Sequence, residues 1–107
     1  MLTKEIHEEG VLKAREATKQ YISAVGPHPL MCGFSWVVVM VKGNTKIGKS
    51  FIAQGFKKHY HGGYYLWNPS GWPTQDMSAK MAGTREYVET IEKYLPEVSV
   101  YANSKLD

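Results

Sequence analysis

The segment from Gly43 to Ser50 reads GNTKIGKS and fits the phosphate-binding-loop pattern G-x-x-x-x-G-K-[ST]. In such loops, successive backbone N–H groups hold an anion at the start of a helix, a lysine reaches the phosphates and a hydroxyl binds Mg²⁺. Gly48, Lys49 and Ser50 are therefore candidate anion-binding residues. The pattern follows an apolar run, residues 34–41, that predicts a strand, as such loops require. One interpretation of the sequence is thus nucleotide or anion binding.

The other parts of a nucleotide-hydrolysing site are missing from the sequence. No later apolar run ends in an aspartate that could hold the metal, because residues 64–67 lead into Asn68. The segment after Ser50 is too short for the parallel βα units that nucleotide hydrolases use. Lys46 also stands where the familiar loop has a glycine, which adopts the required backbone geometry at lower cost. A turn between a strand and a short helix explains the pattern more simply, and weak anion binding stays open.

The middle of the chain combines basic and aromatic residues. The net charge is +3, yet all ten acidic residues lie outside residues 17–75. Lysines neutralise phosphates and aromatic rings stack on bases, so this mixture predicts nucleic-acid binding, with single strands favoured. The candidate phosphate contacts are Lys46, Lys49, Lys57 and Lys58, and the candidate stacking residues are Tyr60, Tyr64 and Trp67, with Trp36. The alternative is that the aromatic residues form the core and the lysines are only solvated.

A second interpretation rests on Trp72, which stands between Gly71 and Pro73 in a segment rich in turn-forming residues. A tryptophan held rigidly in a polar loop is the kind of group that dominates protein interfaces. Trp72 and Pro73 are therefore candidate protein-interaction residues, for a host protein or for a homodimer. The alternative is that Trp72 folds back onto the core, as tryptophan often does.

Other chemistries have less support. His59 and His61 would lie on one face of a strand and could offer two imidazoles to a metal, but no third ligand is near. Cys32, the single cysteine, is interpreted as a small apolar residue at the start of a strand. No G-x-S-x-G elbow occurs, and paired carboxylates for acid–base work are absent from the middle of the chain. The sequence predicts a non-enzymatic binding protein with no cofactor and no metal.

The order of elements follows from hydrophobic periodicity and from helix stop signals. The first half of the chain is expected to form a helix over 4–25 ended by Gly26-Pro27, a loop over His28–Leu30, and a central strand over 34–41 that is covered on both faces. A short helix is expected over 46–54, with a hairpin strand as the alternative, and then a hairpin of 56–60 and 64–67 around His61-Gly62-Gly63. The last elements are a helix over 77–95, capped by Asp76 or Thr74, and a half-buried strand over 98–103.

This order predicts one α+β domain over residues 1–107. The expected architecture is ferredoxin-like (split βαβ) or a similar two-layer sandwich, with about four strands and an extra N-terminal helix. Helices on one side of the sheet would leave its other face free for a partner, unless the N-terminal helix covers it.

The sequence also sets an expected location. No apolar run approaches the ~20 residues that span a bilayer, so no membrane contact is expected. The acidic N-terminus is unlike a signal or transit peptide. A single cysteine does not call for an oxidising compartment. The expected location is cytoplasmic.

The C-terminal part of the chain carries a resemblance. The segment GYYLWNPSGWPTQD over residues 63–76, the run AKMAG over 79–83 and the ending NSKLD over 103–107 resemble small proteins of tailed bacteriophages. The likeness covers about the last forty-five residues, and no activity or catalytic residue comes with it. The resemblance implies a phage product in the cytoplasm of a bacterial host, where small proteins often bind host factors or nucleic acid.

Overall fold

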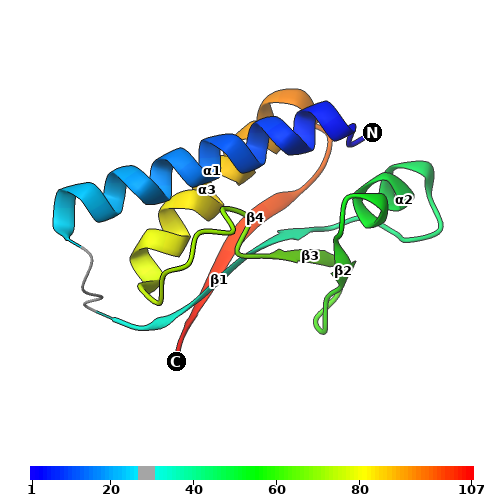
Figure 1. Ribbon diagram of the computed structural model, residues 1–107. Helices are drawn as coiled ribbons and strands as arrows, with labels where there is room; N and C mark the ends of the chain where they lie inside the picture. Colours follow the sequence, from blue (N-terminus) through cyan, green and yellow to red (C-terminus); the bar gives the residue numbers. More distant parts are fainter. Residues whose placement is uncertain (27–30) are drawn as a thin grey trace.

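The computed structural model describes residues 1–26 and 31–107; the expected Pro27 helix stop and the His28–Leu30 loop lie outside this part. The described chain folds into a helical layer on one antiparallel sheet, which confirms the predicted α+β two-layer fold (Figure 1). None of its helices is both long and apolar enough to cross a membrane. The elements are α1 (Lys4–Val25), β1 (Gly33–Val39), α2 (Lys46–Ala53), β2 (Lys57–Lys58), β3 (Tyr64–Trp67), α3 (Met77–Tyr94) and β4 (Val100–Leu106).

The strands lie in the order β2-β3-β1-β4, and every neighbouring pair is antiparallel. Strands β1 and β2 therefore run the same way with β3 between them, and β3 and β4 run the same way with β1 between them. These are two interleaved split βαβ units, the arrangement that the sequence predicts.

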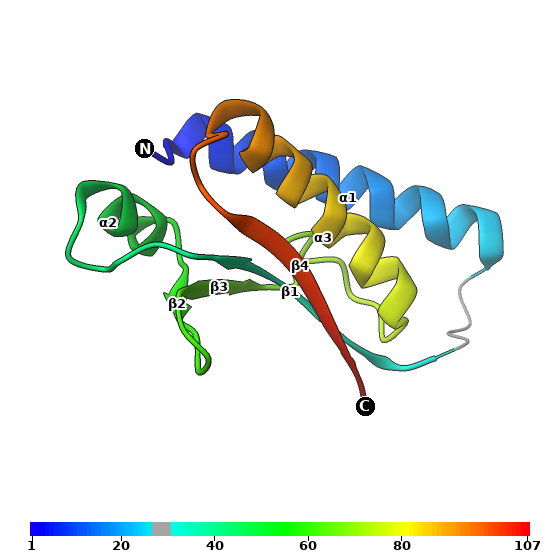
Figure 2. The ribbon, with the colours of Figure 1, turned by 180° about the vertical axis from the view of Figure 1, so that it is seen from behind.

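The helices α1 and α3 lie side by side over one face of the sheet (Figures 1 and 2). They approach closely because glycines stand at the contact. A Cβ added at Gly83 would lie 2.6 Å from Thr18 Oγ1 and 2.9 Å from the carbonyl oxygen of Ala14, and one added at Gly10 would lie 2.7 Å from the ring of Tyr87. The N-terminal helix thus joins α3 in one layer and leaves the opposite face of the sheet uncovered by any described helix.

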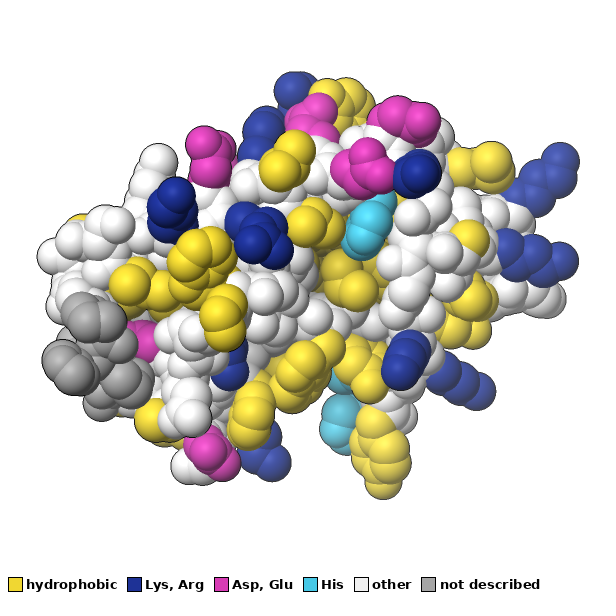
Figure 3. Space-filling view, viewed as in Figure 1, with side chains coloured by type: hydrophobic (Ala, Val, Ile, Leu, Met, Phe, Trp, Pro, Cys, Tyr) yellow, Lys and Arg dark blue, Asp and Glu magenta, His cyan; other side chains and the backbone are white. Residues whose placement is uncertain are grey.

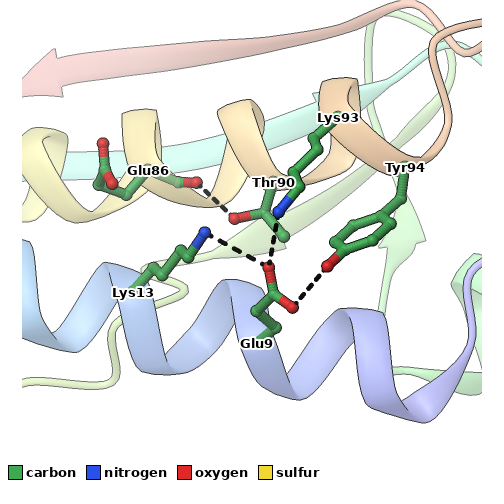
Figure 4. A network of polar contacts seen from close by, with 6 residues as sticks. All are labelled: Glu9, Lys13, Glu86, Thr90, Lys93 and Tyr94. Atoms are coloured by element: carbon green, nitrogen blue, oxygen red, sulfur yellow. Dashed lines mark hydrogen bonds and ion pairs between the residues drawn. The ribbon is translucent and has the colours of Figure 1, made fainter.

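A polar network also ties α1 to α3 (Figure 4). The Tyr94 hydroxyl donates a hydrogen bond to Glu9 Oε1 at 2.8 Å, and Lys13 Nζ and Lys93 Nζ lie 3.3 and 4.0 Å from Glu9 Oε2. The hydrogen bond from Tyr94, with the two lysines, holds the pKa of Glu9 below its ordinary value. Because these groups are partly exposed, the network adds orientation between the helices more than stability.

The core lies between the helical layer and one face of the sheet. Val37 and Val39 of β1 are fully buried, and they pack in one cluster with Tyr87 and Ile91 of α3. Val38, between them, faces the other way and is fully buried as well. Trp36, on that second face, is only half-buried. The prediction that β1 is covered on both faces therefore holds at Val38 and fails at Trp36: aromatic side chains, and no described helix, lie on its second face.

The short helix α2 lies beyond the end of the sheet, beside the base of the β2–β3 hairpin (Figure 1). Thr45 is its N-cap, with Oγ1 accepting from Gly48 N at 3.0 Å. Phe51 of this helix is fully buried and meets Phe56 edge to face, with ring centroids 5.1 Å apart. The predicted short helix is confirmed, and the competing hairpin strand is wrong.

Two boundaries show how capping and pairing set the ends of elements. Asp76 caps α3, because its Oδ1 accepts from Ser78 N at 2.8 Å and Ala79 N at 3.2 Å, as one of the two predicted caps would. The last strand begins two residues later than expected, since Val98 N bonds to Leu95 O in a turn. It then runs on to Leu106, because its full length pairs with β1.

His7 makes stability depend on pH. Its Nδ1 lies 2.7 Å from the Tyr87 hydroxyl, and burial lowers the pKa of His7, against the opposite effect of Glu8. The unfolded chain therefore takes up a proton first as the pH falls below 6.5, the ordinary value, so the free energy of unfolding falls there. We expect His7→Gln to make the melting temperature fall less than in the wild type between about pH 7.5 and pH 5.5. Equal falls in thermal melts of both proteins would contradict this.

Candidate nucleic-acid interface

The face of the sheet away from the helices carries aromatic side chains on three neighbouring strands. In the register, Trp36 of β1 stands opposite Trp67 of β3 and opposite Asn103 of β4. Val38 stands opposite Tyr65 and opposite Tyr101 in the same way. Opposite residues on neighbouring strands point to the same side, and so do residues two apart along one strand. The aromatic face, as we name it, consists of Phe34, Trp36, Tyr65, Trp67 and Tyr101.

The rings of the aromatic face support one another. Trp36 and Trp67 are stacked, with centroids 5.4 Å apart and ring planes 12° apart, and Phe34 lies 5.3 Å from Trp67. Tyr65 meets Trp67 nearly edge to face at 6.5 Å. These contacts hold Trp67 in place while 51% of it stays exposed, and Tyr101 on the same face is 42% exposed. Clustered exposed rings on a sheet are a feature of interaction sites.

Cations border the aromatic face. Lys105 stands opposite Phe34, and Lys57 stands opposite Tyr65, so both belong to this side of the sheet. Lys80 Nζ lies 5.2 Å from the Phe34 ring centroid, within the range of a cation–π contact. Figure 3 shows basic side chains projecting without acidic neighbours at the α2 and hairpin end, whereas acidic and basic side chains mix over the helical layer. The uneven charge along the sequence thus becomes an uneven charge in space.

The β2–β3 hairpin adds a hollow beside the aromatic face. The His59 backbone N–H donates a hydrogen bond to Gly63 O at 2.9 Å, which closes the turn. Gly62 and Gly63 have φ angles of 105° and 72°, as predicted for a tight turn. The hollow measures about 360 Å³ and is lined by Trp36, Lys58, His59, Tyr60, Tyr65 and Trp67. Among the described residues, the Trp36 indole N–H is buried without a hydrogen-bond partner. An unmet buried donor next to a hollow is compatible with a ligand site.

The structure brings together only part of the predicted nucleic-acid set. Trp67, Lys57 and Tyr60 lie at the aromatic face or its rim, and Lys58 lines the hollow. Tyr64 stands opposite Val39, so it lies on the core face and packs against the core.

The other two predicted lysines, Lys46 and Lys49, lie on α2 beyond the end of the sheet. Sequence reasoning left out four neighbours of the site: Phe34, Tyr65, Tyr101 and Lys105.

In the loop at Gly43–Ser50, the backbone N–H groups of Gly48 and Lys49 and the Ser50 hydroxyl already have partners within the chain, and weak anion binding stays a prediction. Residues 46–48 already belong to α2, and the backbone N–H groups of Gly48 and Lys49 donate to Thr45 Oγ1 and Thr45 O. The Ser50 hydroxyl donates to Ile47 O at 2.6 Å and accepts from Leu2 N at 2.9 Å. Because these donors already have partners, the loop has the geometry of a capped turn.

The Trp72 loop folds back toward α1. Trp72 is half-buried, and the guanidinium carbon of Arg15 lies 5.5 Å from its ring centroid. Its backbone N–H donates to Ser70 Oγ at 3.2 Å, and Ser70 is fully buried. Only Pro73, the other predicted interaction residue, is exposed. This packing favours the alternative in which Trp72 folds back, here against Arg15 of α1 and not against the core cluster.

The remaining candidates do not gather into a reactive site. The rings of His59 and His61 lie 5.9 Å apart, and no group of three metal-ligating side chains occurs in residues 1–26 and 31–107. Cys32 stands just before β1 as expected, but it is exposed rather than packed, with Sγ 3.8 Å from Gln75 Oε1.

Comparison with known proteins finds no matching family model, no matching curated protein and no matching solved structure.

Proposed function

We propose that this protein binds single-stranded nucleic acid across the aromatic face. One observation carries the proposal: the described helices leave this face uncovered, and it presents stacked, partly exposed rings between lysines. Trp67 is 51% exposed while resting on Trp36, so its outer surface is open to a base. Base–aromatic stacking contributes about 1–3 kcal/mol per base and does not depend strongly on sequence.

The arrangement suggests how a strand would lie. Bases would stack on Trp67, Tyr65 and Tyr101, and the backbone phosphates would meet Lys57 at one side and Lys105 at the other. A base offers its flat face only when it is unpaired, so a single strand fits this surface better than a duplex. The binding needs no catalytic group, and a non-enzymatic role stays a prediction.

A protein-interaction role stays as the alternative prediction, in a homodimer or with a host protein. The half-buried Trp72 supports it less than the aromatic face supports nucleic acid. Phage origin and a bacterial cytoplasm stay predictions as well, and they are compatible with either role.

The salt dependence of binding tests the proposal. We expect a fluorescein-labelled single-stranded oligonucleotide to bind at low salt, with log K falling with log [salt] by about 0.7 for each phosphate contacted. The double variant Lys57→Glu/Lys105→Glu, which reverses the two lysines on the side of the aromatic face, should lower that slope by about 1.4 and weaken binding at low salt. The matched control is Lys4→Glu/Lys19→Glu, which reverses two exposed lysines on α1.

Fluorescence anisotropy titrations measure this binding, and they can contradict the proposal. Undetectable binding at low ionic strength, or binding that salt leaves unchanged, would remove the proposal. Equal losses in the two double variants would show that net charge, and not the aromatic face, attracts the strand.

A further inference from the structure

Side chains of β1, β3 and the β2–β3 hairpin surround the hollow beside the Trp36–Trp67 pair, which is open to solvent. We propose that it holds one unpaired nucleobase with its phosphate, so that it is a nucleoside monophosphate pocket within the wider surface. The inference rests on the proposed function and assigns one position of the bound strand to one place on the protein.

Aromatic rings make up most of the wall of this hollow. Trp36 and Trp67 stack at one side, and Tyr65 meets both Trp67 and His59, at centroid distances of 6.5 and 5.7 Å. Tyr60 stands on the hairpin tip, next to His61 at 4.9 Å. A volume of about 360 Å³ lies at the small end of the range of about 300–1,000 Å³ for ligand sites, which suits one nucleotide unit.

Among the residues that line the hollow, Tyr60 gives the strongest indication of a bound base. Its side chain is 93% exposed, although the ring is large and mostly apolar. A ring that stays in solvent next to an aromatic hollow gains buried area only when something fills that hollow. A base placed against Trp67 would bring a second flat surface to Tyr60, so the exposed ring fits the role of a lid on a stacked base.

Charge determines which flat ligand fits. Lys57 stands opposite Tyr65 and so shares the aromatic face, and Lys58, the next residue of β2, lines the hollow although it stands opposite Tyr64. None of the described residues that line the hollow is acidic. An anionic ligand with an aromatic ring therefore complements the site better than a neutral or cationic one. A nucleoside monophosphate has this chemistry: the base meets the rings and the phosphate meets the lysines.

Titration with AMP and with UMP tests the pocket directly. We expect both to shift the backbone amide signals of the hairpin in NMR spectra at millimolar concentrations, and we expect ribose 5-phosphate to bind more weakly because it lacks a base. Tyr60→Ala should weaken mononucleotide binding about 5- to 150-fold, the range for loss of one stacked ring. The melting temperature of Tyr60→Ala should equal that of the wild type, because a side chain that is 93% exposed makes almost no packing contacts.

Tyr101→Ala is the matched control, because Tyr101 is an exposed tyrosine on the same face but not in the wall of the hollow. This variant should keep mononucleotide affinity and lose oligonucleotide affinity. If mononucleotides fail to bind, or if Tyr60→Ala binds them as the wild type does, the pocket is disproved. When oligonucleotides still bind in that case, the wider proposal survives; when neither ligand binds, both proposals fail.

Discussion

Trp67→Ala is expected to weaken the binding of a single-stranded oligonucleotide by about 5- to 150-fold, corresponding to about 1–3 kcal/mol for a lost stacking platform. Trp67 is the residue on which the most contacts of the aromatic face converge, since Phe34, Trp36 and Tyr65 all meet its ring. The fold should survive the change, because half of the side chain is already in solvent. Anisotropy titrations at constant low salt, with a melting curve for each protein, measure both quantities.

Tyr94→Ala is the matched control for this experiment. Tyr94 is 40% exposed on α3, in the helical layer, and its hydroxyl bonds to Glu9. Its loss should lower stability slightly and leave oligonucleotide affinity unchanged. Should Trp67→Ala bind as tightly as the wild type, or should Tyr94→Ala lose as much affinity, the aromatic face is not the binding surface.

Gly83→Ala is expected to lower the free energy of unfolding by about 2 kcal/mol, because overpacking a tight contact costs about 1–3 kcal/mol. The added methyl group would meet Thr18 Oγ1 at 2.6 Å and the Ala14 carbonyl oxygen at 2.9 Å. The Thr18 hydroxyl is buried and donates to Ala79 O at 2.7 Å, so it has little room to move. The gain of up to about 1 kcal/mol from replacing a helical glycine offsets only part of this cost.

Thermal and urea unfolding measure this change, which corresponds to a drop of roughly 10 °C in a domain of this size. Ala82→Ser is the control. Ala82 is the neighbouring residue of α3 and lines an open groove between the two helices, so the one added atom has room. An unchanged melting temperature for Gly83→Ala would mean that α1 does not lie this close to α3. The evidence that both helices lie in one layer, and so leave the opposite face of the sheet uncovered, would then be lost.

Local signals in the sequence predicted most of the fold, because each element carries its own pattern. The first helix runs over Lys4–Val25 as expected, where Gly26 ends it, and Asp76 begins the helix of residues 77–94. Glycines at positive φ close the expected hairpin. The order of elements then leaves few topologies, and the split βαβ arrangement is among them.

The site was predicted less well, although the alternation of residues along each strand could have corrected part of the prediction. In a strand, residues two apart share a face, so Tyr65 goes with Trp67, and Tyr64 goes to the core. The prediction selected the lysines and aromatic residues by composition and did not apply this alternation. Tyr101 was beyond local reasoning for another reason: only the pairing of β4 with β1, distant in the chain, brings it beside Val38.

The Gly43–Ser50 segment shows how a motif depends on its backbone. The residue types match a phosphate-binding loop, but the helix begins at Lys46, and the Thr45 cap takes the amide of Gly48. A sequence pattern records which residues are present and not which N–H groups are free. The absence of the other parts of a nucleotide site pointed to the same answer before the structure did.

The three tryptophans allow one measurement that tests the central claim most directly. Trp36 and Trp67 belong to the aromatic face, whereas Trp72 packs beside Arg15 near α1. In a titration of ¹⁵N-labelled protein with a single-stranded oligonucleotide, the account predicts that the indole N–H signals of Trp36 and Trp67 shift and that the Trp72 signal stays in place. A shift of the Trp72 signal alone, or no shift of any indole signal at low salt, would contradict it.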